Sequence, residues 1–166
     1  VGGNATLSVT ATGGTPSLTY QWYSNASNAN TGGTLISGAT SSSYTPPSSG
    51  AGTIYYYCII SASGSGCGST TTNAATVVVV ADPAVSVQPV GFTECIGGTA
   101  TISVTATGGT PGLTYQWYSN ASNSNTGGTL ISGATSASYA PPSLSAGTTY
   151  YYCIVSASGN GCGSAT

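Results

Sequence analysis

The chain has 166 residues and a net charge of −2, because Lys, Arg and His are absent and only two acids are present. Only 1% of its residues are charged, whereas an average soluble domain has about 25%. Without cations, no side chain can replace the counterions on phosphate, so nucleic acid is excluded as a partner. Acid–base catalysis relies mainly on His, Glu, Asp and Lys. We therefore expect no enzyme activity, no cofactor and no metal site.

The rest of the composition favours a folded chain with a hydroxyl-rich surface. Ser and Thr number 27 each, alongside 25 Gly, yet 39% of the residues are hydrophobic. Disordered chains combine low hydrophobicity with high net charge, and this chain has neither property. Its longest apolar run, residues 77–81, is far shorter than the roughly 20 residues of a membrane-spanning helix, so no membrane span is expected.

The predicted elements are strands, because apolar residues recur with a period of two and not of 3.6. In chain order, they cover residues 5–11, 18–23, 54–60 and 77–79, and in the third we expect Ile54, Tyr56, Cys58 and Ile60 to point inward. Short turn clusters interrupt the runs, which is typical of a β-sandwich or barrel. These clusters are Gly13-Gly14, Pro46-Pro47 and Gly64-Ser65-Gly66.

The sequence contains an internal duplication. Residues 1–71 align without a gap with residues 96–166, and 58 of the 71 positions are identical. We predict two domains, 1–81 and 82–166, of which the first is missing its first strand and the second most of its last. Two explanations stay open. The chain is a window onto a longer array, or a subunit whose sandwiches are completed by strands of neighbouring subunits, as in donor-strand complementation.

Trp22, followed by Tyr56-x-Cys58, resembles the pattern of immunoglobulin-like domains, and Trp117 with Tyr151-x-Cys153 repeats it. The resemblance implies two tandem immunoglobulin-like β-sandwiches of Greek-key type. It places Trp22 and Trp117 on strand C in the core, and it makes Tyr56 and Tyr151 the tyrosine corners. An alternative use of the two tryptophans is as platforms on which sugars stack.

The chain also resembles the tandem repeats of large secreted bacterial surface proteins of the adhesin type. These often carry Cys-x-Gly-Gly before strand B and Cys-Gly after strand F, seen here as Cys95-Ile-Gly-Gly and Cys162-Gly. One departure concerns the inter-sheet disulfide of antibody-type domains. Val9 and Val104 stand where the strand-B cysteine would be, so we expect that bridge to be missing.

Five cysteines leave at least one without a partner inside the chain. In one scheme, Cys67 and Cys162 bond to the preceding unit, Cys95 bonds to the following unit, and Cys58 and Cys153 are buried thiols that pack as small apolar groups. In the rival scheme, hairpin bridges join Cys58 to Cys67 and Cys153 to Cys162. Both schemes imply an oxidising, extracellular setting.

Some exposed polar groups are candidates for contact or modification. Six tyrosines fall on the outward parity and are either plain surface residues or assembly contacts: Tyr23, Tyr55, Tyr57, Tyr118, Tyr150 and Tyr152. Three asparagines match the N-glycosylation motif, although chance matches are common in such a composition: Asn4, Asn25 and Asn120. The two acids, Asp82 and Glu94, are too far apart along the chain to share a calcium site.

The surface itself points to self-association. Natural sheets guard their edges with Lys and other charges, and this chain has almost none. We expect a structural subunit of an extracellular filament or cell-surface stalk, whose partners are copies of itself. One alternative is an adhesin that binds glycans through loops 24–33 and 119–128. Another is an accessory domain of a secreted enzyme.

Overall fold

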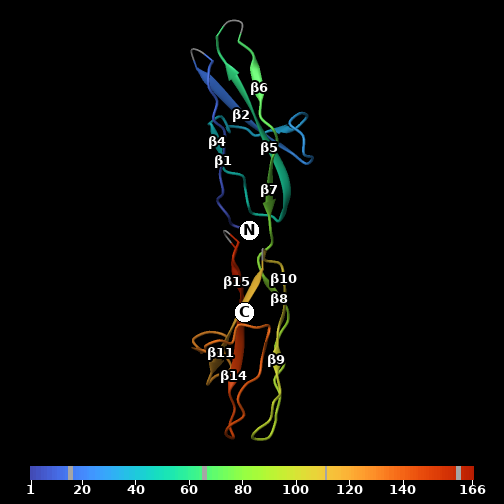
Figure 1. Ribbon diagram of the computed structural model, residues 1–166, viewed down its shortest axis with the longest axis vertical. Helices are drawn as coiled ribbons and strands as arrows, with labels where there is room; N and C mark the ends of the chain where they lie inside the picture. Colours follow the sequence, from blue (N-terminus) through green and yellow to red (C-terminus); the bar gives the residue numbers. More distant parts are fainter. Residues whose placement is uncertain (15–16, 65–66, 111, 160–161) are drawn as a thin grey trace. The chain divides into compact units, whose positions relative to one another are not determined.

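The computed structural model describes residues 1–14, 17–64, 67–110, 112–159 and 162–166. It divides into two compact units, Gly2–Val79 and Val80–Thr166, the second of which also takes in Val1. Throughout the described ranges the regular structure is β-strand (Figure 1), which confirms the predicted all-β class. Within them, no helix is long and apolar enough to cross a membrane.

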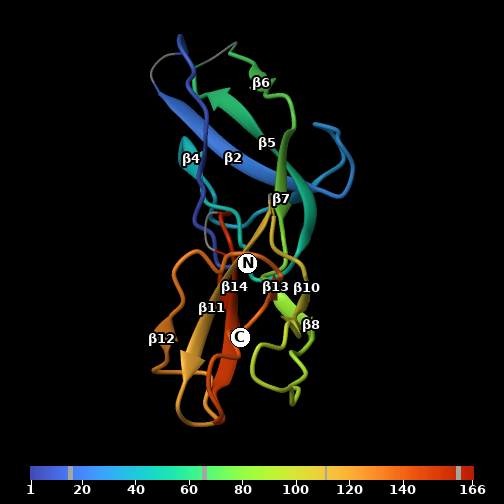
Figure 2. The ribbon, with the colours of Figure 1, turned by 60° about the horizontal axis from the view of Figure 1, so that its bottom comes forward.

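The N-terminal unit, Gly2–Val79, has a larger sheet in the order β3-β2-β5-β6, with β7 also paired to β5, and a smaller sheet of β1 and β4. The long strands β2 and β5 lie side by side in both ribbon views (Figures 1 and 2). The strands are β1 (Leu7–Ser8), β2 (Leu18–Asn25), β3 (Thr34–Leu35), β4 (Ser43–Tyr44), β5 (Gly52–Ala62), β6 (Ser69–Thr71) and β7 (Ala75–Val79).

The core of this unit lies between its two sheets. Trp22 of β2 is directly opposite Cys58 of β5, and both are buried together with Tyr56 and Ile60. The alternation predicted for β5 is therefore confirmed at three of its four positions. The exception is Ile54, which is 42% exposed.

The C-terminal unit, Val80–Thr166, repeats this arrangement with a sheet in the order β12-β11-β14-β15 and two pairs, β13-β9 and β10-β8. Its core contains Ile102, Val104, Trp117, Cys153 and Val155. The strands are β8 (Ala84–Val87), β9 (Ile102–Ser103), β10 (Thr105–Thr107), β11 (Leu113–Asn120), β12 (Thr129–Leu130), β13 (Ser138–Tyr139), β14 (Tyr150–Ala157) and β15 (Ser164–Ala165).

The first predicted strand is shorter than its alternating pattern indicates. Of residues 5–11, only Leu7 and Ser8 form a strand, because they alone pair with β4. In the C-terminal unit, the counterpart of residues 10–12 is the strand β10, which forms because it pairs with β8. Among the described residues of the N-terminal unit, nothing pairs with residues 10–12. A period of two therefore shows which side chains share a face, but the length of a strand depends on its partner.

Two of the predicted turn clusters can be placed. Gly13 and Gly14 both have left-handed backbones, with φ of 81° and 74°, which glycine adopts without steric cost. The pair Pro46-Pro47 lies outside the strands, which agrees with the lack of a backbone N–H in proline. The third cluster, residues 64–66, lies partly outside the described residues.

Candidate functional site

The two tryptophans are core residues in this structure. Trp22 and Trp117 are 3% and 0% exposed, and each indole Nε1 donates a hydrogen bond of 2.9 Å to a backbone oxygen, of Ser41 and Ser136 respectively. A buried indole needs a hydrogen-bond acceptor for its N–H. Here the acceptor is a backbone carbonyl of the segment just before β4 or β13. Neither ring face is available for a sugar to stack on.

The tyrosines that precede the buried cysteines pack beside these indoles. The rings of Tyr56 and Tyr44 have centroids 5.6 Å apart, and Tyr44 in turn stacks on Trp22 at 6.1 Å. In the C-terminal unit, Tyr151 and Tyr139 make the equivalent contact at 5.8 Å. Burial raises the pKa of Tyr56 above its ordinary value of 10.0, and the nearby Tyr44 raises it further. The tyrosine-corner role of Tyr56 and Tyr151 stays a prediction.

The outward tyrosines are less exposed than their parity indicates. Tyr57 and Tyr152, offered above as assembly contacts, are only 3% and 9% exposed. The loop after β2 covers Tyr57, because Gly33 N donates a hydrogen bond of 3.1 Å to the Tyr57 hydroxyl. Gly128 N donates one of 3.2 Å to Tyr152 in the same way. The contact role assigned to Tyr57 and Tyr152 is therefore corrected, since a loop of their own unit already occupies the outer face.

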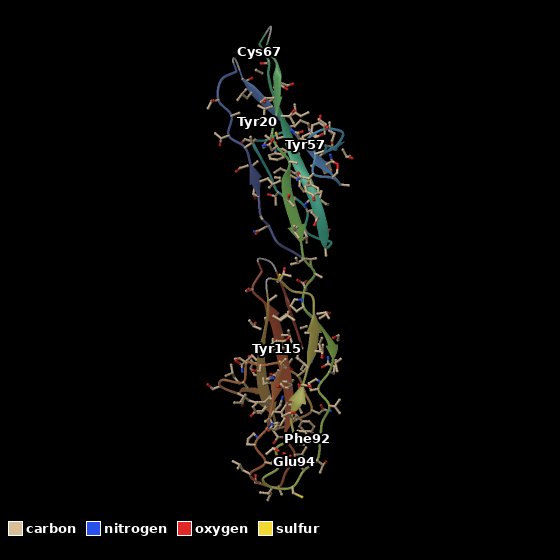
Figure 3. The ribbon with its side chains drawn as sticks, turned by 45° about the vertical axis from the view of Figure 1, so that its right-hand side comes forward. Tyr20, Tyr57, Cys67, Phe92, Glu94 and Tyr115 are labelled. Atoms are coloured by element: carbon tan, nitrogen blue, oxygen red, sulfur yellow. The ribbon has the colours of Figure 1, made fainter. Side chains whose placement is uncertain are left out.

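The remaining outward tyrosines differ in exposure. Tyr23 stacks on Tyr57 with the rings 4° from parallel and 5.1 Å apart, and Tyr118 stacks on Tyr152 at 5.0 Å. Tyr23, Tyr118 and Tyr55 are half-buried, whereas Tyr150 is 37% exposed. Tyr150 therefore presents the most accessible ring of the six. Figure 3 shows Tyr57 among the side chains of the larger sheet, and Cys67 near one end of the N-terminal unit.

Two of the cysteines are buried thiols. Cys58 is 0% and Cys153 is 3% exposed, and burial raises the pKa of each thiol above its ordinary value of 9.0. Val104, at the position of the usual disulfide partner, is 5% exposed in the same core as Cys153. Each buried thiol therefore packs as a small apolar group and stays protonated at neutral pH. By contrast, Cys67 and Cys95 are exposed and Cys162 is half-exposed.

The register of the β5–β6 hairpin separates the cysteines of the rival hairpin scheme. Ile59 pairs with Thr71, and Thr72 N donates to Cys58 O over 3.0 Å, so Thr72 is the residue across from Cys58. Cys67 comes five residues before Thr72, about 16 Å along a strand. Disulfide partners have Cα atoms within about 7 Å. This register therefore disfavours a bridge between Cys58 and Cys67, and the inter-unit scheme stays a prediction.

The glycosylation candidates Asn25 and Asn120 already use their side chains. Asn25 Nδ2 donates to the backbone oxygens of Ala29 and Thr31, at 3.1 and 3.0 Å, and its Oδ1 accepts from Ser27 N at 3.1 Å. Asn120 repeats this pattern in its own loop. A sugar on Nδ2 would disturb these bonds, so both side chains serve to shape loops. Asn4 is exposed, and its modification stays a prediction.

The two acids stabilise separate loops. Asp82 Oδ1 accepts a hydrogen bond of 3.0 Å from Gly163 N, and this bond is the main cause that lowers the pKa of Asp82. Glu94 accepts from Ala100 N at 2.9 Å and from the Ser143 hydroxyl. Figure 3 shows Glu94 close to Phe92 at one end of the unit. The two carboxylates thus have different partners and do not face a common site.

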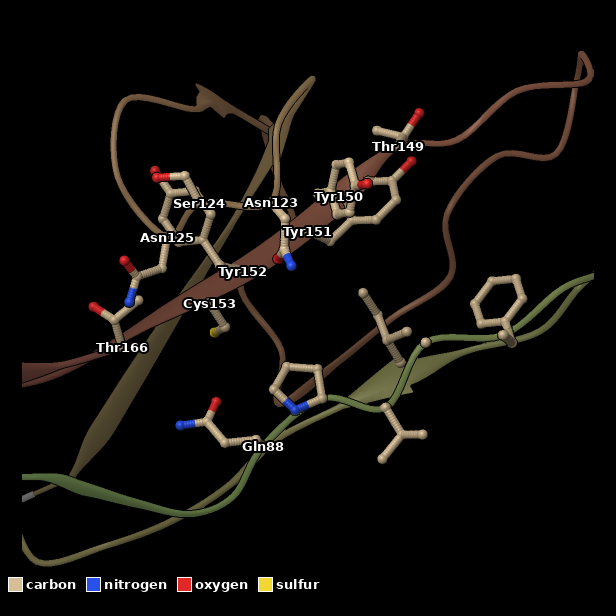
Figure 4. A pocket seen from close by; sticks show the side chains of 15 residues that line it. Gln88, Asn123, Ser124, Asn125, Thr149, Tyr150, Tyr151, Tyr152, Cys153 and Thr166 are labelled. Atoms are coloured by element: carbon tan, nitrogen blue, oxygen red, sulfur yellow. The ribbon is translucent and has the colours of Figure 1, made fainter.

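The C-terminal unit contains a cavity of about 450 Å³ that is partly open. One wall is residues 149–153 of β14 and the chain just before it, and the opposite wall is residues 88–92 (Figure 4). Asn123–Asn125, Ile102 and Thr166 complete the lining. In the wall formed by residues 88–92, the apolar side chains Val90 and Phe92 are 77% and 40% exposed. Sequence reasoning missed this site, because residues 88–92 show no strand pattern and give no signal of their own.

Comparison with known families identifies the fold. Residues 81–166 match the family described as the Ig-like domain that is CHU_C associated. The chain belongs to this Ig-like domain family. This membership agrees with Trp117 packing over Cys153 in a two-layer core, and it confirms the resemblance to immunoglobulin-like repeats. Residues 2–81 match a second family, described as a domain of unknown function.

Solved structures of immunoglobulin domains resemble this Ig-like chain. The amphioxus IgVJ-C2 molecule is 16% identical, with 99% of this chain and 93% of that chain covered, and has a TM-score of 0.41. The structure of Sidekick-1 immunoglobulin domains 1–5 is also 16% identical, with 99% and 36% covered, and has a TM-score of 0.35. No curated protein matches the chain.

Proposed function

We propose that this chain is a structural subunit of an extracellular filament or cell-surface stalk, in which tandem Ig-like units associate through their sheet edges. The observation that carries the proposal is the chemistry of those edges. In the described part of the larger sheets, the edge strands include β3, β6 and β7 in one unit and β12 and β15 in the other. None of these strands contains a charged residue.

Unguarded edges of this kind favour strand-to-strand association. The edge strands β3 and β12 also carry Leu35 and Leu130, each 53% exposed. A net charge of −2 gives little long-range repulsion between copies. The electrostatic free-energy cost of bringing two edges together is therefore small. The outward backbone N–H and C=O groups of each edge strand are available to pair with a neighbour.

The internal duplication supports a structural role over a binding role. Loop 24–33 and loop 119–128 differ at a single position, Ala29 against Ser124, and both fold back onto a tyrosine of their own unit. An adhesin with two different ligands would need loops that differ. The proposed setting is extracellular and bacterial, which suits a chain without Lys or Arg, because trypsin-like proteases then find no cleavage site.

Electron microscopy and analytical ultracentrifugation of the purified chain over a range of concentrations test this function. We expect linear assemblies that grow with concentration. A chain that stays monomeric and dispersed at the highest concentration would exclude the filament. A matched variant carries Thr34→Lys and Thr129→Lys, which place one charge on each of the edge strands β3 and β12. This variant should assemble less while keeping its melting temperature.

A further inference from the structure

A second cavity of the C-terminal unit lies beside β13, in the segment that connects β12 of the larger sheet to β13. Its volume is about 300 Å³, and its lining lies within residues 132–140. Residues of both layers hold this segment, because Trp117 N donates to Ala134 O at 3.0 Å and Val104 N donates to Ala137 O at 2.9 Å. The β13 cavity is therefore formed by one continuous stretch whose backbone is tied to both layers of the unit.

Hydroxyl groups dominate the lining of the β13 cavity. Four of the lining residues are exposed serines or threonines, namely Ser132, Thr135, Ser136 and Ser138. In the part of the chain that the structure describes, their hydroxyls make no hydrogen bond to another residue. Each hydroxyl offers one donor and two acceptor lone pairs. The cavity therefore presents both donors and acceptors to a ligand, and it presents them without any charge.

The remainder of the lining is apolar and includes a tyrosine that is held in place. Ala134, Tyr139 and Ala140 line the cavity beside the hydroxyls. The ring of Tyr139 is half-buried, with its centroid 6.1 Å from that of Trp117 and 5.8 Å from that of Tyr151. Two aromatic neighbours thus fix the ring before any ligand arrives, so binding costs little side-chain entropy at this position.

These properties select one class of ligand. An ionic ligand would lose its hydration without meeting an opposite charge, and a purely apolar ligand would cover the hydroxyls without giving them partners. A sugar ring meets both requirements, because it has apolar C–H faces and a rim of uncharged hydroxyls. A volume of about 300 Å³ is at the lower end of the range for small-molecule sites, about 300–1,000 Å³. The cavity therefore has room for a single ring.

The duplicated unit differs at the rim of this cavity. Residues 37–45 of the N-terminal unit differ from residues 132–140 at two positions, and one of them is Thr45 in place of Ala140. The Thr45 hydroxyl is 2.9 Å from the Thr6 hydroxyl, with which it shares a hydrogen bond. Ala140 lacks both the hydroxyl and the methyl group of a threonine. The C-terminal unit therefore has more room at a position that lines the cavity.

We propose that the β13 cavity of the C-terminal unit binds one uncharged hexose ring. The C–H face of the ring lies toward Tyr139 and Ala140, and its hydroxyls bond to the four serine and threonine hydroxyls of the lining. The site goes beyond the structural function proposed above, because a filament subunit does not require it. It also gives the two units different roles, since only the C-terminal unit has alanine at this rim position.

Nuclear magnetic resonance of the isotope-labelled full chain tests the site, with the methyl α-glycosides of glucose, mannose and galactose as probes. For a ligand of one ring we expect a dissociation constant of about 1–10 mM. At least one of the three probes should shift the amide signals of residues 132–140 saturably. Residues 37–45 are the internal control and should respond at least about tenfold more weakly, because Thr45 narrows the equivalent place. Failure of all three probes to give saturable shifts, or equal responses in the two units, overturns the proposal.

Exchanging residues between the units supplies the matched variants. Ala140→Thr should weaken binding at least about tenfold, and Thr45→Ala should raise the response of residues 37–45 by a similar factor. The other difference between the two segments is Ala137, which is outside the lining, so Ala137→Ser should leave binding unchanged. Each substitution introduces the residue of the duplicate unit, and equal melting temperatures check that folding is kept. Wild-type binding by the Ala140→Thr chain overturns the proposal.

The outcomes separate this inference from the filament. Saturable shifts at residues 132–140 in a chain that never assembles leave the sugar site standing and exclude the filament. Assembly without saturable shifts leaves the filament standing and excludes the sugar site.

Discussion

Trp117 and Cys153 lie directly opposite each other on β11 and β14, and both side chains are almost fully buried. Trp22 and Cys58 repeat the relationship on β2 and β5. In an antibody-type domain this cysteine would be half of a disulfide, but here Val104 packs in the same core. The sandwich therefore depends on apolar packing around a reduced thiol, and several of the expectations below derive from that arrangement.

Replacing the buried thiol should weaken the C-terminal unit. Cys153→Ser places a more polar hydroxyl in the apolar core. The acceptor of the thiol, Ile154 O, lies 3.7 Å from the sulfur, which is too far for a good O–H···O bond, so we expect a loss of about 1–3 kcal/mol in the free energy of unfolding. Urea denaturation in reducing buffer, followed by tryptophan fluorescence, measures this loss. The exposed Cys95 supplies the control, because Cys95→Ser should change the stability by less than about 0.5 kcal/mol. Equal effects of the two substitutions would contradict the buried-thiol assignment.

Alkaline pH should destabilise both units. Burial raises the pKa values of Cys58 and Cys153 above their ordinary 9.0, so the unfolded chain loses these protons at a lower pH than the folded chain does. Their contribution to stability is complete below the pKa of the unfolded thiols and is lost as the pH rises through the folded values. The tyrosines Tyr56 and Tyr139, whose pKa values burial also raises, act in the same direction near pH 10.

Thermal unfolding measured from about pH 8 to about pH 10.5 tests this behaviour. The wild-type chain should lose stability steadily over this range. A double variant, Cys58→Ala with Cys153→Ala, starts from a lower stability but should lose less of it with rising pH. The same slope in both chains would show that the thiols do not contribute to the alkaline transition.

Acidic pH should act through Asp82. The hydrogen bond from Gly163 N lowers the pKa of this carboxyl below its ordinary 3.8. Its contribution is therefore present above the unfolded value and is lost as the pH falls through the folded one. Asp82→Asn keeps an acceptor oxygen but removes the titration. Calorimetry from about pH 5 down to about pH 2 should show a smaller loss of stability in this variant than in the wild type, and identical curves would contradict the assignment.

The loop that covers Tyr152 should tolerate no side chain at Gly128. A Cβ atom there would lie 2.6 Å from Ser119 O and 2.8 Å from the Tyr152 ring. Gly128→Ala should therefore destabilise the C-terminal unit by about 1–3 kcal/mol and speed hydrogen exchange at the amide of residue 128. At Gly112, by contrast, a Cβ atom would meet nothing within 4 Å, so Gly112→Ala should leave the stability within about 0.5 kcal/mol. Similar losses at both sites would show that the loop is not packed as described.

The sequence alone is enough to predict the all-β fold, the duplication and the inward positions of Trp22, Tyr56 and Cys58. These follow from local patterns, because successive side chains on a strand point to opposite faces and the apolar face must be buried. The motif around each tryptophan and cysteine then selects the immunoglobulin-like arrangement. The valines at the strand-B positions predict that the inter-sheet bridge is missing, but the sequence leaves a hairpin bridge open as an alternative to free thiols.

Tertiary structure decided what lies over each outward face. Tyr57 has outward parity, yet it is buried because loop 24–33 returns to it and Gly33 binds its hydroxyl. The partner of Cys58 across the hairpin is likewise set by the register with Thr72 and not by the spacing of cysteines. The cavity beside β14 arises only where residues 88–92 meet that strand. Period and spacing fix the face on which a side chain lies, but segments distant in sequence determine whether that face is covered, paired or open.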